Sequence, residues 1–266
     1  MEGLIVAHET PIYISLTSIF KNQGLLKNTL DSILEQSQKP DKIFIYLSED
    51  PSFHDEGFFN KKITHDGLKN TLAQHKKLIE IIWGKDIGPF GKLLPLLKQK
   101  WKENCLIITI DDDVIYHNTL IKNLLEDYLK YNCAISYRGF TPRFKKFEDF
   151  DYESRDEDHC LQKKNFATGK GSVLYAPWFF HKTKDLIFNE DIYPNTTKTN
   201  DDIWFYIIRV LNNIPCYINN KQKWQLKLQK SDGLWVNFNR RWKDGVNINT
   251  KLFRDTVKEL KLRNLI

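Results

Sequence analysis

Three consecutive carboxylates, Asp111, Asp112 and Asp113, directly follow an unbroken run of apolar and β-branched residues at 106–110. A run this short and this rich in branched side chains predicts a strand that is buried on both faces. Three carboxylates at the end of such a strand repel one another unless a cation lies among them. Mg²⁺ or Mn²⁺, shared between a few carboxylates and phosphate oxygens, is the usual cation. The alternative is a solvated acidic turn that caps the next helix.

A second acidic pair, Asp201 and Asp202, follows Asn200 and precedes apolar residues that recur at helical spacing over 203–211. This pattern predicts an amphipathic helix. Asn or Asp is a favourable N-cap, and acids in the first turn interact well with the helix dipole. The residues alone therefore explain the pair as the start of a helix.

Strand-like and helix-like segments alternate along the first half of the chain. The strand patterns occur at 12–16, 42–47, 78–83 and 106–110, and the helical patterns occur at 25–34, in a short stretch ending near 77, and at 92–101. Such alternation is the signature of a parallel sheet. In open sheets of this kind ligands collect at the carboxyl ends of the strands, which is where Thr17, Ser48, Asp86 and Asp111–Asp113 lie.

The second half of the chain is less regular. A helix at 118–131 and a strand at 133–137 are followed by an acid-rich segment, 144–164, with few aliphatic residues. We interpret this segment as a long loop or flap at the mouth of the site, with a solvated surface insertion as the alternative. The segment 167–172 then leads into Val173-Leu174-Tyr175, and an amphipathic helix is expected at 252–262.

Composition limits the class of protein. The chain has 266 residues, 41% hydrophobic and 28% charged, which is ordinary for a soluble globular protein of one large domain. The net charge of +6 suits an anionic small molecule, an acidic membrane surface or nucleic acid. Because the basic residues are scattered, a nucleic-acid-binding face is not singled out, and nucleic acid is not the expected partner.

Location and several enzyme classes can be judged from missing motifs. The start of the chain lacks a signal-peptide pattern, no window approaches the roughly 18 apolar residues of a membrane span, and the four cysteines have no zinc or disulfide spacing. We therefore expect a cytoplasmic protein. Gly91-Lys92 is not part of a P-loop, and Gly-x-Ser-x-Gly and His-Glu-x-x-His are absent.

Taken together, the motifs resemble the GT-A fold glycosyltransferases, in particular family-2-like members. The resemblance spans about 12–211 and rests on Leu16-Thr17-Ser18-Ile19, Asp86-Ile87-Gly88-Pro89-x-x-Lys92, Thr109-Ile110-Asp111-Asp112-Asp113, Gly169-x-Gly171 and Asn200-Asp201-Asp202-Ile203-Trp204. It implies an α/β fold with a Rossmann-like, open, mixed and mostly parallel sheet flanked by helices in a single domain. Within it, 12–137 would bind the nucleotide-sugar, 138–220 would face the acceptor, and 221–266 would form a basic, helical C-terminal tail.

The resemblance also implies roles for individual residues. As a DxD-type motif, Asp113 would bind Mn²⁺ or Mg²⁺ directly against the donor diphosphate, Asp111 would support the metal or the nucleotide, and Asp112 would reach the ribose. The donor side would further include Thr17, Ser18, Asp86 and Lys92. Lys92 would contact a phosphate; the alternative is an ordinary surface lysine. Asp202, with Asp201 able to exchange roles, would be the base of an inverting transfer.

Some residues depart from the family pattern or allow two interpretations. Phe238 stands where polymer-forming members have Gln before Arg241-Trp242, and no His follows His181 to complete a metal site. A processive synthase is therefore not expected. Trp178 and Trp204 are candidates to stack on a sugar ring, although a tryptophan on an amphipathic helix is more often part of the core.

The sequence thus predicts a metal-dependent, inverting glycosyltransferase that moves one sugar from a nucleotide-diphosphate sugar, with UDP favoured, to a glycan, lipid-linked or protein acceptor. One alternative is a sugar-phosphate nucleotidyltransferase, although 17–24 lacks the Gly-rich, Arg-containing loop of that class. The other is a non-enzymatic basic module that uses 221–230 and the C-terminal helix to bind nucleic acid or anionic lipid. The same tail is also a candidate for peripheral membrane association of an active enzyme.

Overall fold

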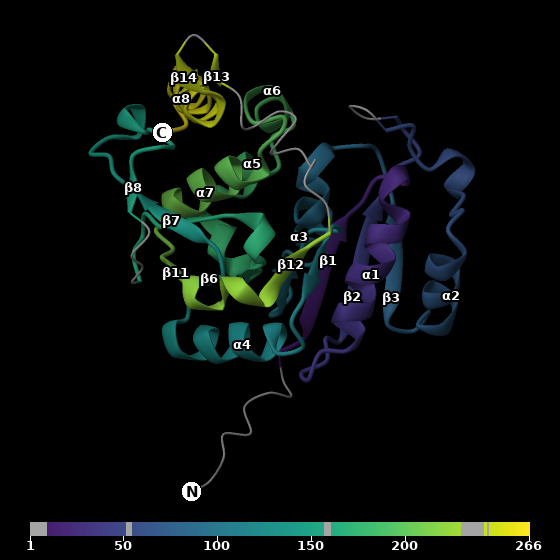
Figure 1. The fold of residues 1–266 in the computed structure, drawn as a ribbon. Coiled ribbons are helices and arrows are strands. Elements are labelled where there is room, and N and C mark those ends of the chain that lie inside the picture. The colour runs from purple at the N-terminus through teal and green to yellow at the C-terminus, as the bar shows by residue number, and fades with distance from the viewer. Residues whose placement is uncertain (1–9, 52–54, 157–160, 230–241, 244) are drawn as a thin grey trace, which may run out of the picture.

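The computed structural model describes residues 10–51, 55–156, 161–229, 242–243 and 245–266. Its centre is a seven-stranded sheet with the order β11-β6-β10-β4-β1-β2-β3 (Figure 1). Four of these strands, β1 (Ile12–Thr17), β2 (Lys42–Leu47), β3 (Ile79–Trp83) and β4 (Leu106–Thr109), are parallel to their neighbours among the four. Ile14 lies opposite Ile43 on one side and Ile108 on the other. The predicted parallel arrangement is confirmed.

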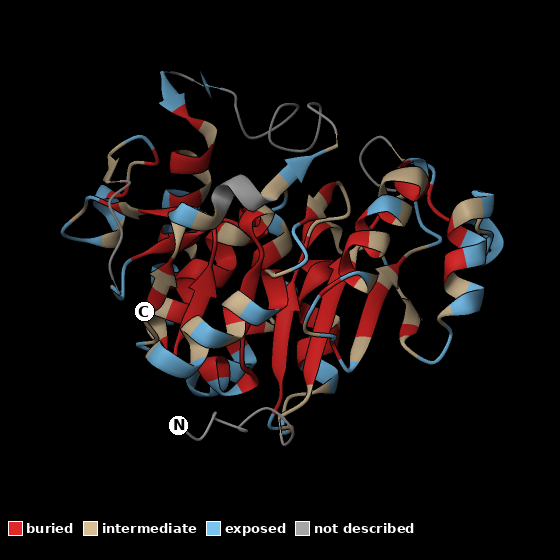
Figure 2. Ribbon diagram, turned by 60° about the horizontal axis from the view of Figure 1, so that its bottom comes forward, coloured by how far each residue is buried: buried red, intermediate tan, exposed pale blue. Residues whose placement is uncertain are grey.

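Helices flank this sheet, and its inner strands are largely buried, whereas the edge strand β3 is half-buried after Ile79 (Figure 2). The helices of the first half are α1 (Gln23–Leu34), α2 (Asp66–Gln74), α3 (Leu94–Gln99) and α4 (Leu120–Tyr131). Short 3₁₀ helices η1 (Phe20–Asn22), η2 (Phe59–Lys61) and η3 (Gly88–Lys92) lie between them. The continuous aliphatic runs of the strands are explained by burial on both faces.

One strand of this sheet, β10, runs in the opposite direction to the other six. Strand β10 (Val173–Tyr175) is antiparallel to both β4 and β6 (Ala134–Ser136), and β11 (Cys216–Ile218) is parallel to β6 at the sheet edge. The result is a mixed, mostly parallel open sheet in a single domain, as the sequence predicts. The loop that follows β4 and the loop that precedes β10 therefore lie at the same end of the sheet.

Smaller elements complete the second half. Three small sheets join β5 (Val114–Tyr116) to β12 (Leu226–Leu228), β7 (Gly139–Pro142) to β8 (Arg155–Asp156) and β9 (Phe166–Ala167), and β13 (Trp242–Lys243) to β14 (Val246–Asn247). The helices are η4 (Phe147–Asp149), η5 (Gly169–Gly171), η6 (Pro177–Thr183), α5 (Lys184–Ile187), α6 (Tyr193–Thr196), α7 (Asp201–Leu211), η7 (Asn220–Gln225) and α8 (Ile248–Leu262). No helix in the described ranges combines the length and apolarity needed to cross a membrane.

An aromatic cluster joins the acid-rich segment to α8. The rings of Phe150 and Phe253 stack at 3.8 Å between centroids, and Phe147 and Tyr206 also lie against Phe253. The described part of this segment, which excludes 157–160, thus has its own η4 and β8 and a buried aromatic face. Aromatic side chains bury 150–250 Å² each, so the segment packs in spite of its few aliphatic residues.

Two of the differences from the predicted helix boundaries have a clear cause. The predicted helix 92–101 is divided into η3 and α3 at Leu93, and Pro95 lies in the first turn of α3, where a missing N–H is tolerated. Helix α8 begins four residues before the predicted start because the Asn247 side chain accepts a hydrogen bond from Asn249 N and caps the helix. Helix α8 buries Phe253, Val257 and Leu260.

Candidate active site

The acidic triplet occupies the tight connection between β4 and β5. Asp111, Asp112 and Asp113 are all partly exposed, whereas Ile110 before them and Val114 after them are fully buried. The backbone there is held from the side: Asp111 N donates to Tyr116 Oη at 2.9 Å, and Gln229 N donates to Asp113 O at 2.9 Å. The apolar neighbours anchor the turn and leave its carboxylates at the surface of the sheet end.

Helix α1 and the loop before it hold Asp112. The Ser18 hydroxyl donates to Asp112 Oδ2 at 2.5 Å, and Asn22 Nδ2 donates to the same oxygen at 2.9 Å. Thr29 Oγ1 lies 2.9 Å from the Asp112 carbonyl oxygen. Ser18 and Asn22 are both buried. The structure therefore joins Ser18 to the triplet and adds Asn22, which the sequence interpretation missed; a polar residue just before an amphipathic helix was the available signal.

Lys92, at the end of η3, joins the triplet to the second acidic pair. Its Nζ lies 2.9 Å from Asp111 Oδ1 and 3.3 Å from Asp201 Oδ2, and the residue is only 8% exposed. Burial acts to lower the pKa of Lys92, but the carboxylates of Asp111, Asp201 and Asp202 outweigh it and raise the pKa well above its usual value. The ammonium group is thus a permanent positive charge inside the site, and the surface-lysine alternative is wrong.

The second acidic pair lies at the start of α7. Asp201 is 5% exposed and Asp202 is partly exposed, and Asp202 Oδ1 accepts a hydrogen bond from Gly169 N at 2.9 Å. Burial raises the pKa of both carboxyls, to about 8 for Asp201, even though Lys92 opposes the shift. Carboxyl groups with raised pKa values are typical of sites that exchange protons.

The residue before the pair does not act as a simple cap. Asn200 makes no side-chain hydrogen bond to the first turn of α7; its Nδ2 donates instead to Asn249 Oδ1 at 2.8 Å, in α8. Asn247 Nδ2 in turn donates to Glu153 Oε1 at 2.7 Å. A buried amide chain therefore ties the start of α7 to α8 and the acid-rich segment.

Gly169, the first residue of η5, lies beside the side chains of Lys92 and Asp202. A Cβ atom at this position would lie 2.6 Å from Lys92 Nζ and 2.9 Å from Asp202 Oδ1, which is closer than real contacts allow. A side chain here would displace one of these two charged groups, so the absence of a Cβ atom lets the backbone N–H reach Asp202 beside the lysine.

Thr17 and Asp86 have mainly local contacts. Thr17 Oγ1 donates to the Tyr46 carbonyl oxygen at 2.9 Å, which links β1 to β2, and Asp86 Oδ1 accepts from Gly88 N at 2.8 Å. Asp86 thereby shapes the turn that leads into η3 and places Lys92. Of the predicted donor residues, the structure brings Ser18, Lys92 and Asp112 into contact with the acidic groups.

The carboxylates at the end of β4 suit one kind of metal site. In the described residues no group of three or more His, Cys, Asp or Glu side chains is arranged to hold an ion. Mg²⁺ often needs no such group, because it binds through one or two carboxylates, substrate phosphates and water. Asp111 and Asp113 fit a cation that is held jointly with a diphosphate, and they do not form an all-protein cage.

Two other features lie away from this site. Trp204 is fully buried and donates from Nε1 to Ile187 O, so it belongs to the core, whereas Trp178 is 39% exposed.

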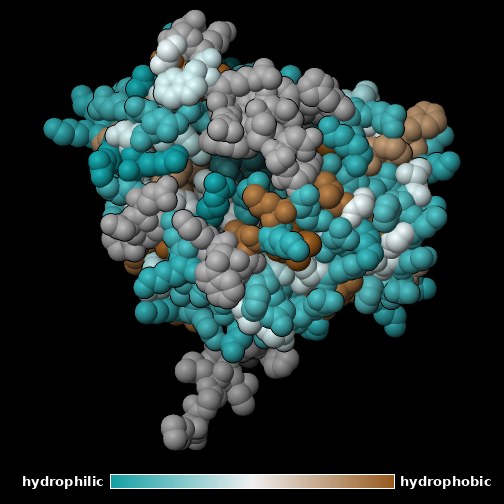
Figure 3. Space-filling model, viewed as in Figure 1, coloured by the Kyte–Doolittle hydropathy of each residue, from teal (hydrophilic) through white to brown (hydrophobic). Residues whose placement is uncertain are grey.

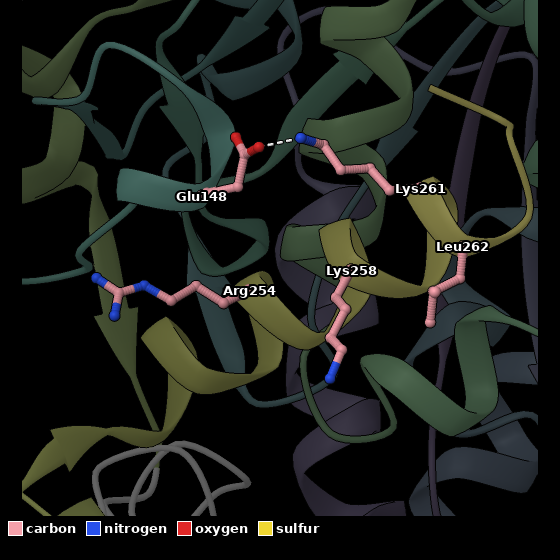
Figure 4. Close-up of a pocket in the computed structure, with 5 residues that line it drawn as sticks. All are labelled: Glu148, Arg254, Lys258, Lys261 and Leu262. Atoms are coloured by element: carbon pink, nitrogen blue, oxygen red, sulfur yellow. Dashed lines mark hydrogen bonds and ion pairs between the residues drawn. The ribbon is translucent and has the colours of Figure 1, made fainter.

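A cavity of about 410 Å³ lies against α8 and is lined by Glu148, Arg254, Lys258, Lys261 and Leu262, with Lys261 paired to Glu148 (Figure 4). None of these residues belongs to the acidic site. On the face seen in Figure 3, hydrophilic side chains predominate, and hydrophobic ones are visible mainly near the middle and at the upper right.

Comparison with known proteins supports the fold. No known family model matches the chain, and no curated protein sequence matches it. Among solved structures, S. aureus TarS 1–349 in complex with UDP-GlcNAc is similar, with a TM-score of 0.53 and 14% identity over 84% of this chain and 60% of that one. The complex of the same protein with UDP gives 0.50 and 12% over 79% and 57%, and a further TarS structure gives 0.51 and 13% over 79% and 36%.

These similarities, together with the strand order, define the fold as the GT-A type. At this level of identity they concern the fold alone. The chain spans at most about 60% of the length of these TarS chains.

Proposed function

We propose that this protein is a glycosyltransferase that transfers a single sugar from a nucleotide-diphosphate sugar, with a UDP-sugar as donor. The observation that supports this most is the meeting of two acidic segments, Asp111–Asp113 and Asp201–Asp202, around one buried lysine at the carboxyl end of the parallel strands. One segment is suited to a cation and a diphosphate, and the other to proton transfer. A sugar transfer from a diphosphate needs both.

On the donor side, Asp111 and Asp113 would bind Mn²⁺ or Mg²⁺, which would supply Lewis-acid stabilisation of the leaving diphosphate. Asp112 would face the ribose, and its orientation would be fixed by the Ser18 hydroxyl and the Asn22 amide. Because both of these groups are buried, the Asp112 carboxylate is held in one position before the donor arrives.

On the acceptor side, Asp202 would take the proton from the attacking hydroxyl. The acceptor oxygen then forms its bond to the sugar carbon, the bond from that carbon to the diphosphate breaks, and the nucleoside diphosphate leaves. The raised pKa of Asp202 makes it a better proton acceptor than an ordinary aspartate, and Gly169 N orients the carboxylate. Attack opposite the leaving group would invert the sugar carbon.

The TarS complexes with UDP-GlcNAc and UDP favour UDP as the donor nucleotide here. The acceptor class proposed is a glycan, lipid-linked or protein hydroxyl. Peripheral membrane association through the C-terminal segment stays a prediction. A sugar-phosphate nucleotidyltransferase is less well supported, because the segment after β1 leads into η1 and holds Asp112, and lacks the Arg-containing loop of that class.

Thermal unfolding with nucleoside diphosphates tests the donor site. We expect one nucleotide, UDP, to raise the midpoint only when Mn²⁺ or Mg²⁺ is present. At about 100 times its Kd a ligand adds roughly 2.7 kcal/mol, which corresponds to roughly 5–10 °C for a chain of this size. Asp113→Asn should abolish the rise, whereas Asp185→Asn, an exposed acid in α5, should keep it. No rise with any nucleotide and metal would refute the donor site.

A further inference from the structure

Lys92 is the cation that contacts both acidic segments in the described part of the chain. Its Nζ makes a hydrogen-bonded ion pair with Asp111 Oδ1 at 2.9 Å, and it lies 3.3 Å from Asp201 Oδ2 without the geometry of a hydrogen bond. Asp201 Oδ2 is fully buried and has no other hydrogen-bond partner among the described residues. The ammonium group is therefore nearer to Asp111 than to Asp201, although Asp201 Oδ2 is the buried oxygen that lacks a hydrogen bond.

The surroundings leave Lys92 little freedom. Gly169 closes one side, since a Cβ atom there would lie 2.6 Å from Nζ. The charged groups that face Nζ are Asp111 from the end of β4 and Asp201 and Asp202 from the start of α7. A small shift of the ammonium group along the line from Asp111 to Asp201 is the movement that keeps it paired.

We propose that Lys92 is a positioning residue that couples the donor side to the acceptor side. A divalent cation that binds Asp111 competes with Lys92 for that carboxylate, so Lys92 pairs more fully with Asp201 and fixes the first turn of α7, which also carries Asp202. The donor complex thus sets the position of the base before the acceptor is attacked. This inference rests on the proposed function, because it takes the cation at Asp111 as given.

Thermodynamic linkage makes the coupling measurable without any transfer activity. If Lys92 is shared between Asp111 and Asp201, an amide at position 201 cannot form the ion pair with Lys92, so Lys92 stays at Asp111 and weakens cation binding there. With Mn²⁺ titrated into protein saturated with UDP, Asp201→Asn should raise the Kd for Mn²⁺ at least about fivefold. Lys92→Met should remove this effect, so that Asp201→Asn changes little in the Lys92→Met background.

A matched variant separates this coupling from the general electric field. Asp202→Asn makes the same carboxyl-to-amide change at the neighbouring residue, but Asp202 accepts a hydrogen bond from Gly169 N and has no ion pair to Lys92 within 4.0 Å. It should change the Kd for Mn²⁺ by no more than about half as much, on a logarithmic scale, as Asp201→Asn does. Equal effects of the two variants, or an effect of Asp201→Asn that persists with Lys92→Met, would overturn the proposal.

A second variant covers the case in which Lys92→Met does not fold. Gly169→Ala keeps every charge and displaces the ammonium group, so the effect of Asp201→Asn on the Kd should also shrink in that background. Gly24→Ala, where a Cβ atom would meet only His65 at 3.4 Å, is the matched control and should leave the effect intact.

Two further outcomes distinguish the inference from the proposed function. If wild-type protein binds UDP with Mn²⁺ but Asp201→Asn leaves the Kd for Mn²⁺ unchanged, the coupling is wrong and the proposed function stands. If Lys92→Met instead weakens UDP tenfold or more with and without metal, Lys92 is a direct phosphate ligand and the coupling is wrong. If wild-type protein binds no nucleoside diphosphate with either metal, both proposals fail together.

Discussion

The acidic triplet after β4 and the acidic pair at the start of α7 contain the same side chain in different surroundings. The triplet is partly exposed and held by polar groups from α1 and the segment before it, whereas Asp201 is buried against Lys92 and the pair has raised pKa values. The halves that carry them differ as well: aliphatic parallel strands support the triplet, and the aromatic cluster around Phe253 supports the α7 side. Partly exposed carboxylates at the end of a strand are suited to binding a cation, whereas buried carboxyls at the start of a helix are suited to binding a proton.

The largest expected effect tests whether the acidic pair and the acidic triplet have separate chemical roles. Asp202→Asn removes the proposed proton acceptor but keeps a similar shape, so kcat should fall by about 10²–10⁴-fold. The affinity for UDP should change little because the donor is assigned to the triplet. The measurement is UDP release from a UDP-sugar with acceptor, with Asp185→Asn as the control. Full activity of Asp202→Asn would end its assignment as base.

The next effect tests the aromatic support of the second half. Phe253→Ala removes a fully buried ring that stacks on Phe150, and the free energy of unfolding should fall by about 3–5 kcal/mol. Phe59→Ala, at a ring that is 75% exposed, should stay within about 0.5 kcal/mol. Urea unfolding measures both. Equal losses would mean that the cluster does not support this half.

A smaller effect is expected for the amide chain that anchors α7. Asn249→Ala leaves the Asn200 amide without its partner inside the protein and removes one of the hydrogen bonds to Asn247 Oδ1, which should cost about 1–3 kcal/mol. Asn70→Ala, on the exposed face of α2, serves as the comparison and should be neutral or slightly stabilising. A neutral Asn249→Ala in urea unfolding would show that water replaces the lost bonds.

The smallest effect concerns pH. Because the pKa of Asp201 is raised to about 8 in the folded protein, the folded state keeps a proton that the unfolded chain releases near pH 4. Its contribution to stability is present at low pH and is lost as pH rises through this window. Asp201→Asn should therefore gain stability relative to wild type between pH 5 and pH 8, by about 1 kcal/mol or more. A parallel pH dependence of the two proteins would contradict the raised pKa.

Much of the first half could be predicted from the sequence because its signals are local. Uninterrupted aliphatic runs separated by helical patterns specify parallel strands, and parallel strands bring Thr17, Asp86 and Asp111 to one end of the sheet. The pairing of Asp112 with Ser18 follows from this convergence. The contact from Asn22 does not, because a buried amide has no periodic signal.

The second half was harder to predict for a physical reason. The contact of Gly169 with Lys92 and Asp202 depends on β10 running antiparallel to β4, which local patterns do not specify. The packing of the acid-rich segment on Phe253 joins residues that are about a hundred positions apart. The interpretation of that segment as a long loop came from counting aliphatic residues, when aromatic rings provide its buried surface.

The pairing of β12 with β5 has a consequence for the order of assembly during synthesis. Strand β5 directly follows the triplet, and its partner, Leu226–Leu228, leaves the ribosome more than a hundred residues later. Until then the edge of β5 is unpaired, and the bond from Gln229 to Asp113 cannot form. Pairing at such sequence separation is slow, and open edges invite association. The nascent chain therefore completes the turn at Asp111–Asp113 among its last steps, and a chain that stops before 226 should aggregate.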